Sequence, residues 1–276
     1  MYLNSDYKKI MSNKLIITVL IALLLVMIAD PISILIQSIN QPAVFEILGV
    51  NPFQYWILIN SASFGSSVFY IGFFIFPVFF SGVIFHSEQS SSISQILISK
   101  KSKTKYYVSK AISFFSFTFI AFSTLLLINV VITYCIFPNT NNFTEQYQFY
   151  VPQEGTFAYM LYLINPGFMA VGYSLLNGLA LALVSAFYYA VQLIAKFKNQ
   201  YASLIVPVVL FYVISYVFDT LTFLWNYNLK LIIQPISASA LTRIISAQDV
   251  GITFMIWLII DIVLISIGII RNRDIL

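Results

Sequence analysis

Six stretches of the sequence are long and apolar enough to cross a lipid bilayer, and they constrain the fold more than any other feature. A helix needs roughly 20 mostly apolar residues to cross about 30 Å of hydrocarbon. The six segments cover residues 15 to 39, 63 to 85, 111 to 137, 169 to 195, 201 to 224 and 251 to 270. Each is expected to be helical, because backbone amides exposed to lipid have no water to bond. The sequence therefore predicts an all-α membrane protein in which residues 1 to 276 form one transmembrane domain.

Composition supports this class. Hydrophobic residues make up 60% of the chain and charged residues only 9%, against roughly a quarter charged in soluble proteins. The first apolar run follows Lys14, continues past Asp30 and Pro31, and contains no small-x-small cleavage site. We therefore interpret it as a retained anchor rather than a signal peptide. Pro77 and Pro207 interrupt the second and fifth segments and are expected to kink them.

Positive charges predict the orientation. The N-terminal segment holds three, the connection 86 to 110 five, the connection 196 to 198 two and the C-terminal tail two, which makes 12. The opposite loops hold only Lys230 and Arg243. This bias places both termini and the basic connections in the cytoplasm of a cell-membrane protein. The lysines would face anionic lipid or a cytoplasmic partner, so the net charge of +4 requires no nucleic acid. Abundant Ile, Lys, Asn, Ser and Phe fit an A/T-rich bacterial genome.

Sequence motifs give no indication of an enzyme or of a cofactor bound by this chain. The G-x-x-x-x-G-K-[ST] phosphate-binding loop and the H-E-x-x-H zinc motif are both absent. The chain has one histidine, His86, and one cysteine, Cys135, so no His/Cys metal site and no catalytic set can be assembled. No catalytic or metal-ligating residue is predicted.

The connection between the second and third segments contains a short amphipathic pattern. Ile93, Ile96 and Leu97 follow the spacing i, i+3, i+4 and share one face of a short helix, which Ser91 or Ser92 could cap. Such a helix could dock into a groove on another protein. It could equally be an ordinary basic loop lying on lipid.

The residues around this pattern resemble a known family. Glu88, a short Ile/Leu helix, a basic segment and then Ser109-Lys110-Ala111 resemble the second-to-third-helix connection of type-2 ABC transporter permeases. The family usually has a Pro/Arg element where this chain has residues 100 to 103, and a glycine in place of Ser109. The likeness in topology extends over the whole chain, whereas the likeness in residues is confined to this connection.

The resemblance implies a role for the connection and for the N-terminal segment. The connection would be the coupling helix that contacts a separate ATP-binding subunit, with Glu88, Ile93, Ile96, Leu97 and Lys110 as its contact residues. Leu3, Tyr7, Ile10 and Met11 follow a helical spacing and resemble the amphipathic elbow helix of the family. The alternative for this segment is an untethered polar leader.

The resemblance also implies the assembly. The chain would be the membrane-spanning subunit of an ATP-driven exporter, paired with a second copy or a related permease, while ATP and Mg²⁺ bind to the partner ATPase subunits. The aromatic, weakly charged interior suggests a hydrophobic or amphipathic substrate such as a peptide, an antimicrobial compound or a lipid-like molecule.

Polar residues inside the apolar segments are also candidates for function. Asp261 lies near the middle of the last segment, where an unpaired charge would cost several kcal/mol. It would either line a transport pathway or hydrogen-bond to a neighbour such as Asn129 or Asn177. Asp30 and Asp219 are interpreted as simple outer-interface residues.

A stripe of small residues marks the fourth segment as a packing helix. Its members recur at every fourth position and are Ser174, Gly178, Ala182, Ala186 and Ala190. The sequence leaves open whether the neighbouring helix belongs to the same chain or to a second copy.

Two other functions stay open at this stage. The chain could be a non-transporting immunity or sensor protein that binds a partner through its outer loops, 138 to 168 and 225 to 250, in which residues 157 to 164 and 229 to 245 are expected to form interfacial helices. It could also be an intramembrane enzyme that uses Asp261, although no second catalytic group is evident.

Overall fold

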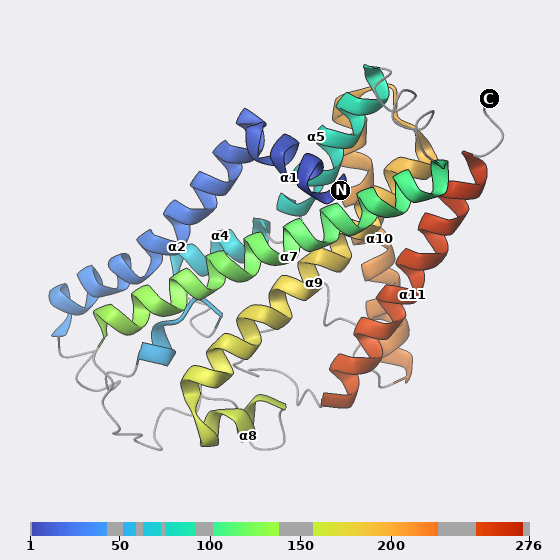
Figure 1. Cartoon of the computed structure of the whole chain (residues 1–276). Coiled ribbons are helices and arrows are strands. Elements are labelled where there is room, and N and C mark those ends of the chain that lie inside the picture. The colour runs from blue at the N-terminus through green and yellow to red at the C-terminus, as the bar shows by residue number, and fades with distance from the viewer. Residues whose placement is uncertain are drawn as a thin grey trace.

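Long helices dominate the structure, a computed structural model that describes residues 2–42, 52–58, 63–72, 75–91, 102–137, 157–225 and 247–272. Every regular element in these ranges is helical (Figure 1). The helices long and apolar enough to cross a bilayer are α2 (Lys14–Asn40), α7 (Lys103–Ile136), α9 (Pro166–Ala195), α10 (Gln200–Trp225) and α11 (Ala247–Arg271). These agree with five of the predicted segments and support a multi-pass membrane protein.

The remaining predicted segment, 63 to 85, forms two helices rather than one. They are α4 (Phe64–Gly72) and α5 (Phe76–Ser90), and Pro77 lies in the first turn of α5. Proline has no N–H to donate and its ring clashes with the preceding turn, so it suits a helix start better than a helix interior. Pro207 lies inside α10, which continues on both sides of it.

Helix α9 is the centre of the bundle. In its most apolar stretch of 18 residues, 83% of the residues are buried inside the protein. The corresponding share is 22 to 33% in the other long helices. It packs against α7, α11 and α5. The five small residues predicted as a packing stripe are all buried. A Cβ added at Gly178 would lie 2.0 Å from the Ser123 Oγ of α7, so at this point the close neighbour is a helix of the same chain.

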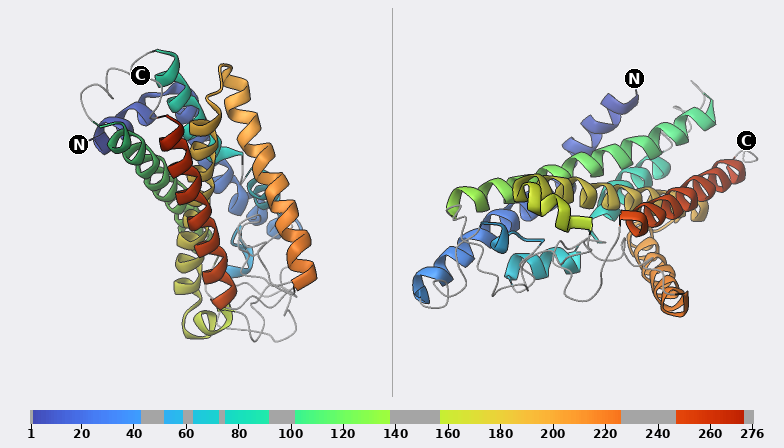
Figure 2. Two further views of the ribbon diagram at one scale, coloured as in Figure 1. Left: turned by 90° about the vertical axis from the view of Figure 1, so that its right-hand side faces the viewer. Right: turned by 90° about the horizontal axis from the view of Figure 1, so that it is seen from below.

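One end of the bundle carries both α1 (Tyr2–Ser12) and the C-terminal end of α11 (Figures 1 and 2), and we call it the terminal end. The chain reaches this end again at Ser90, Lys103, Ala195 and Gln200. All the described lysines and arginines lie in this region: Lys8, Lys9, Lys14, Lys103, Lys105, Lys110, Lys196, Lys198 and Arg271.

At the far end, a segment that the sequence indicated only as a loop enters the bundle. It begins with a 3-10 helix, η1 (Pro52–Tyr55), and continues through Trp56, Ile57 and Leu58, whose side chains are fully buried. The Asn129 side chain of α7 accepts a hydrogen bond from the Ile57 N–H at 3.3 Å and donates one to the Met27 carbonyl of α2 at 2.8 Å. This amide therefore joins three parts of the chain.

Asp30 also has a structural role at this end. It is 1% exposed, and its Oδ1 accepts a hydrogen bond from the Gly65 N–H at 3.0 Å, in the first turn of α4. A carboxylate is favourable there because a helix N-terminus presents unpaired N–H groups and a positive dipole end. The interpretation of Asp30 as a simple interface residue missed this contact, which fastens α4 to α2. The Asp219 side chain lies outside the described part of the chain.

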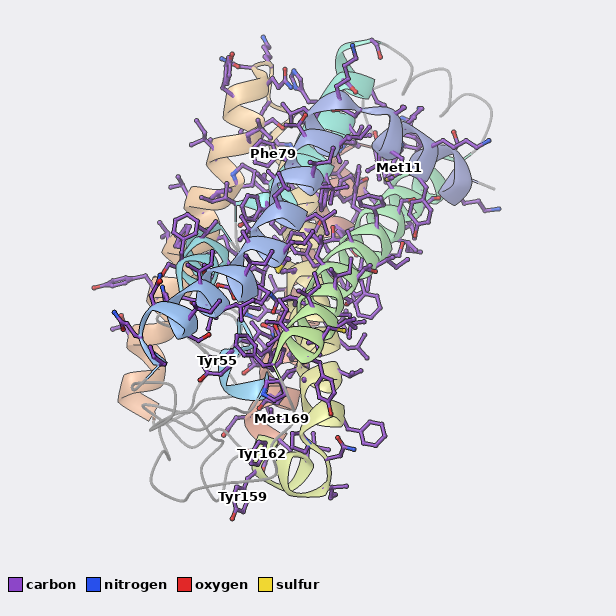
Figure 3. The ribbon with its side chains drawn as sticks, turned by 90° about the vertical axis from the view of Figure 1, so that its left-hand side faces the viewer. Met11, Tyr55, Phe79, Tyr159, Tyr162 and Met169 are labelled. Carbon is purple, nitrogen blue, oxygen red and sulfur yellow. The ribbon has the colours of Figure 1, made fainter. Side chains whose placement is uncertain are left out.

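The predicted helix over residues 157 to 164 is present as α8 (Phe157–Ile164), next to the start of α9. Figure 3 shows its Tyr159 and Tyr162 at the far end, beside Met169 of α9. The second predicted interfacial helix, 229 to 245, lies outside the described residues.

Candidate functional site

A buried cluster of charges joins three helices at the terminal end. At its centre the Lys110 ammonium of α7 is 1% exposed. It donates a hydrogen bond to Glu88 Oε1 of α5 at 2.7 Å and forms a second ion pair with Asp6 of α1. Asp6, Lys9, Glu88, Tyr106 and Lys110 together are called the Lys110 cluster below.

The two carboxylates of the cluster receive further bonds. Lys9 donates to Glu88 Oε1 at 2.7 Å, and the Tyr106 hydroxyl donates to Glu88 Oε2 at 2.6 Å. The Ser113 hydroxyl donates to Asp6 Oδ2 at 2.9 Å. Two cations therefore meet two anions, which is the condition for a buried charge to be tolerated.

The surroundings of Glu88 favour its charged form. Burial acts to raise the pKa of this carboxyl, but the Lys110 charge and the hydrogen bonds from Lys110, Lys9 and Tyr106 outweigh burial. The pKa of Glu88 is therefore lower than its ordinary value. Glu88 stays ionised at neutral pH, and its pairing with Lys110 is retained.

The position of the Lys110 cluster in the chain is what links it to function. Glu88 lies in the last turn of α5 and Lys110 in the second turn of α7, so the cluster closes the base of the connection 92 to 101. Asp6 and the Tyr7 hydroxyl, which donates to Ser116 Oγ at 2.7 Å, fasten α1 to the same stretch of α7. Helices α1, α5 and α7 are thereby locked together where that connection begins and ends.

The structure brings together two of the five residues assigned to ATPase coupling. Glu88 and Lys110 contact each other and are buried within this chain. Ile93, Ile96 and Leu97 lie outside the described residues. Ser91, considered as a helix start, instead ends α5, since its N–H bonds to the Ser87 carbonyl. The described part of the basic segment, Lys103 and Lys105, belongs to α7, which begins at Lys103, ahead of the predicted segment, and is capped by the Ser102 side chain. Lys100 and Lys101 lie outside the described residues.

The helix predicted at the N-terminus is present as α1, with a partly different buried face. Ile10 is fully buried and Tyr7 partly buried, but Met11 is 54% exposed (Figure 3). The Leu3 side chain lies outside the described part. The sequence interpretation missed Asp6, which is buried on the face of Ile10. Its four-residue spacing from Ile10 was a signal that could have identified it.

The three polar candidates within the spans differ in their surroundings. Asn129 bonds across helices as described above, and Asn177 donates to the Tyr173 carbonyl within α9 at 2.9 Å. Asp261 bonds to neither: it is 2% exposed, and neither carboxyl oxygen has a hydrogen-bond partner among the described residues. Within the same part of the chain, no group of three His, Cys, Asp or Glu side chains is placed to hold a metal ion.

Comparison with known proteins adds no information on these features. No family model, no curated protein and no solved structure matches the chain.

Proposed function

We propose that this chain is the membrane-spanning subunit of an ATP-driven ABC exporter, with the connection 92 to 101 as its contact with a separate ATPase. The observation that carries the proposal is the Lys110 cluster, which lies at the base of that connection. Burying three charged side chains, Asp6, Glu88 and Lys110, for structural purposes alone gives little net stability. A more specific use of these charges is to hold α1, α5 and α7 in one arrangement at the base of the connection.

In the proposed topology the chain crosses the membrane six times, and the pair α4 and α5 forms the second, broken crossing. Both termini and the terminal end face the cytoplasm. The support is the gathering of the described lysines and arginines at that end, as the positive-inside rule expects.

The proposed mechanism uses the Lys110 cluster as a rigid joint. Closure of the ATPase subunits on ATP and Mg²⁺ moves the connection 92 to 101. Because α1, α5 and α7 are bonded to one another at its base, they move as one body. Helix α7 transmits the motion to the central helix α9, its most extensive neighbour. Access to the substrate pathway then alternates between the two sides of the membrane.

A second copy or a related permease completes the proposed assembly, and the substrate is hydrophobic or amphipathic. Apolar side chains exposed on the outer faces of α2, α10 and α11 are available to lipid or to such a partner.

The test is co-expression of the chain with the ABC-type ATP-binding proteins of its own genome, followed by purification of any complex that forms. The change Leu97→Asp places a charge on the predicted apolar face of the connection, and Ser94→Asp places one on its predicted polar face. We expect Leu97→Asp to abolish co-purification of the ATPase and the rise in ATP hydrolysis that complex formation produces. Ser94→Asp should preserve both.

The proposal is overturned if the ATPase does not associate with the wild-type chain. It is equally overturned if Leu97→Asp and Ser94→Asp behave alike in both assays while the two proteins remain folded.

A further inference from the structure

Asp261 is the least compensated polar side chain in the described bundle. It is 2% exposed and both its oxygens lack partners. A carboxyl group left in this state is destabilising whether charged or neutral, because each form has hydrogen-bonding capacity that water would otherwise satisfy. Such a group needs a partner, and none lies among the described residues.

No described cation of the chain can be that partner. The described lysines and arginines gather at the terminal end. The nearest along the helix, Arg271, lies about 15 Å further along the axis of α11 at 1.5 Å per residue. A single carboxyl also lacks the several oxygen ligands that Mg²⁺ or Ca²⁺ requires.

A layer of aromatic rings lies one turn away from Asp261. Trp257 precedes it by four residues on α11 and so shares its helix face. The Trp257 ring lies 5.7 Å from Phe187 of α9 and 5.0 Å from Phe211 of α10, and Phe211 lies 5.8 Å from Tyr188 of α9. These four residues are called the aromatic layer.

We propose that Asp261 and the aromatic layer form a binding site for the cationic group of an organic substrate, such as an ammonium or phosphonium. The carboxylate supplies the counter-charge, and no other described acidic side chain lies in this part of the bundle. Ring faces attract a desolvated cation through their quadrupoles. Together they would hold a lipophilic cation at a depth where the described part of the chain offers it no other anion.

Helix α10 provides the route of entry. It contributes Phe211 to the aromatic layer. Only 22% of the residues in its most apolar stretch are buried, and it packs mainly on α5 and α9. Figure 2 shows α10 standing apart from the other long helices in the view from below. In the closed form the rings fill the space themselves. Displacement of α10 would part Phe211 from Trp257 and expose both to the membrane interior.

The experiment measures binding of tetraphenylphosphonium to the full chain in nanodiscs. Its charge is permanent, and neutral triphenylphosphine oxide controls for simple partitioning into lipid. We expect saturable binding of the cation but not of the neutral compound. Asp261→Asn and Trp257→Leu should each weaken cation binding about tenfold or more. Asp249→Asn, on the same helix but at its far end, should bind like wild type.

The proposal is overturned if Asp261→Asn binds the cation as tightly as wild type, or if wild type does not distinguish the cation from the neutral compound. Each variant is first shown to be monodisperse with an unchanged unfolding temperature. Asp261→Glu, which keeps the charge, should restore most of the binding. The view of this cation as a transported substrate rests on the proposed function. The binding assay needs no ATPase, so the exporter proposal can fail while the cation site stands.

Discussion

Two buried ionisable side chains in this protein have opposite surroundings. Lys110 is 1% exposed and pairs with two carboxylates, and those carboxylates receive further bonds from Lys9, Tyr106 and Ser113. Asp261 is buried to a similar degree, but its carboxyl oxygens have no hydrogen-bond partner among the described residues. A satisfied cluster fixes geometry, whereas an unsatisfied group is a place for a ligand. The tasks proposed for the two residues differ accordingly: transmission of motion for Lys110 and binding of a cation for Asp261.

The first prediction concerns Lys110. The change Lys110→Met removes the cation from Asp6 and Glu88 and leaves two anions buried together, so the free energy of unfolding should fall by about 3–5 kcal/mol. Lys105→Met is the matched control, because the Lys105 side chain is exposed on the same helix and should change stability by less than about 0.5 kcal/mol. Unfolding in mixed micelles gives both values. Equal stability of the two variants would contradict the central role of Lys110.

The second prediction concerns pH. Because the pKa of Glu88 is lower in the folded chain than in the unfolded chain, its contribution to stability is complete above the unfolded pKa of about 4.3. The contribution is lost as the pH falls through the folded pKa. Wild type should therefore lose stability relative to Glu88→Gln on going from pH 6 to pH 3. Parallel pH curves for the two proteins would show that Glu88 is not held in its charged form.

At the scale of elements, the sequence predicts the long helices well because each needs only a local apolar run. It predicts poorly where an element depends on distant partners. The burial of Trp56, Ile57 and Leu58 depends on Asn129 and on packing inside the bundle, and no local pattern indicates it. The division of the second segment near Pro77 was predicted as a kink, because proline marks a break without fixing its size.

The candidate site shows the same contrast between local patterns, which the sequence predicts, and contacts between distant residues, which it does not. Glu88 and Lys110 were selected through the family resemblance, as residues of the coupling connection. Their mutual contact and the participation of Asp6 depend on how α1, α5 and α7 pack together. The stripe on α9 predicted close packing, and only the structure identifies α7 as the neighbour at Gly178.

The third prediction tests that packing. A Cβ at Gly178 would lie 2.0 Å from Ser123 Oγ and 3.2 Å from the Phe119 carbonyl oxygen, whereas a Cβ at Gly172 would meet nothing within 4 Å. Gly178→Ala should therefore lower the free energy of unfolding by about 1–3 kcal/mol through overpacking. Gly172→Ala, on the same helix, should be neutral or stabilising by up to about 1 kcal/mol, since alanine is the better helix former. If both variants gain stability, α7 and α9 are not in close contact at Gly178.

For the whole molecule, the orientation in the membrane decides whether the connection 92 to 101 can contact a cytoplasmic ATPase or is an exposed outer loop. The terminal end gathers the described lysines and arginines, and a membrane protein retains such clusters on the cytoplasmic side because positively charged segments are poorly translocated. If the connection 92 to 101 is to meet an ATPase, it must lie on that side as well, because ATP-binding subunits work in the cytosol.

The fourth prediction follows from this requirement and uses the single native cysteine. After Cys135→Ser removes it, Leu97→Cys should react with a membrane-impermeant maleimide only when the cells are permeabilised. Asn142→Cys, in the connection between α7 and α8, should react in intact cells, because α7 is long enough to carry the chain to the other face of the bilayer. Labelling of residue 97 in intact cells would place the Lys110 cluster at the outer surface. The proposed coupling would then be physically impossible, whereas the cation site at Asp261, near the middle of the bundle, would be unaffected.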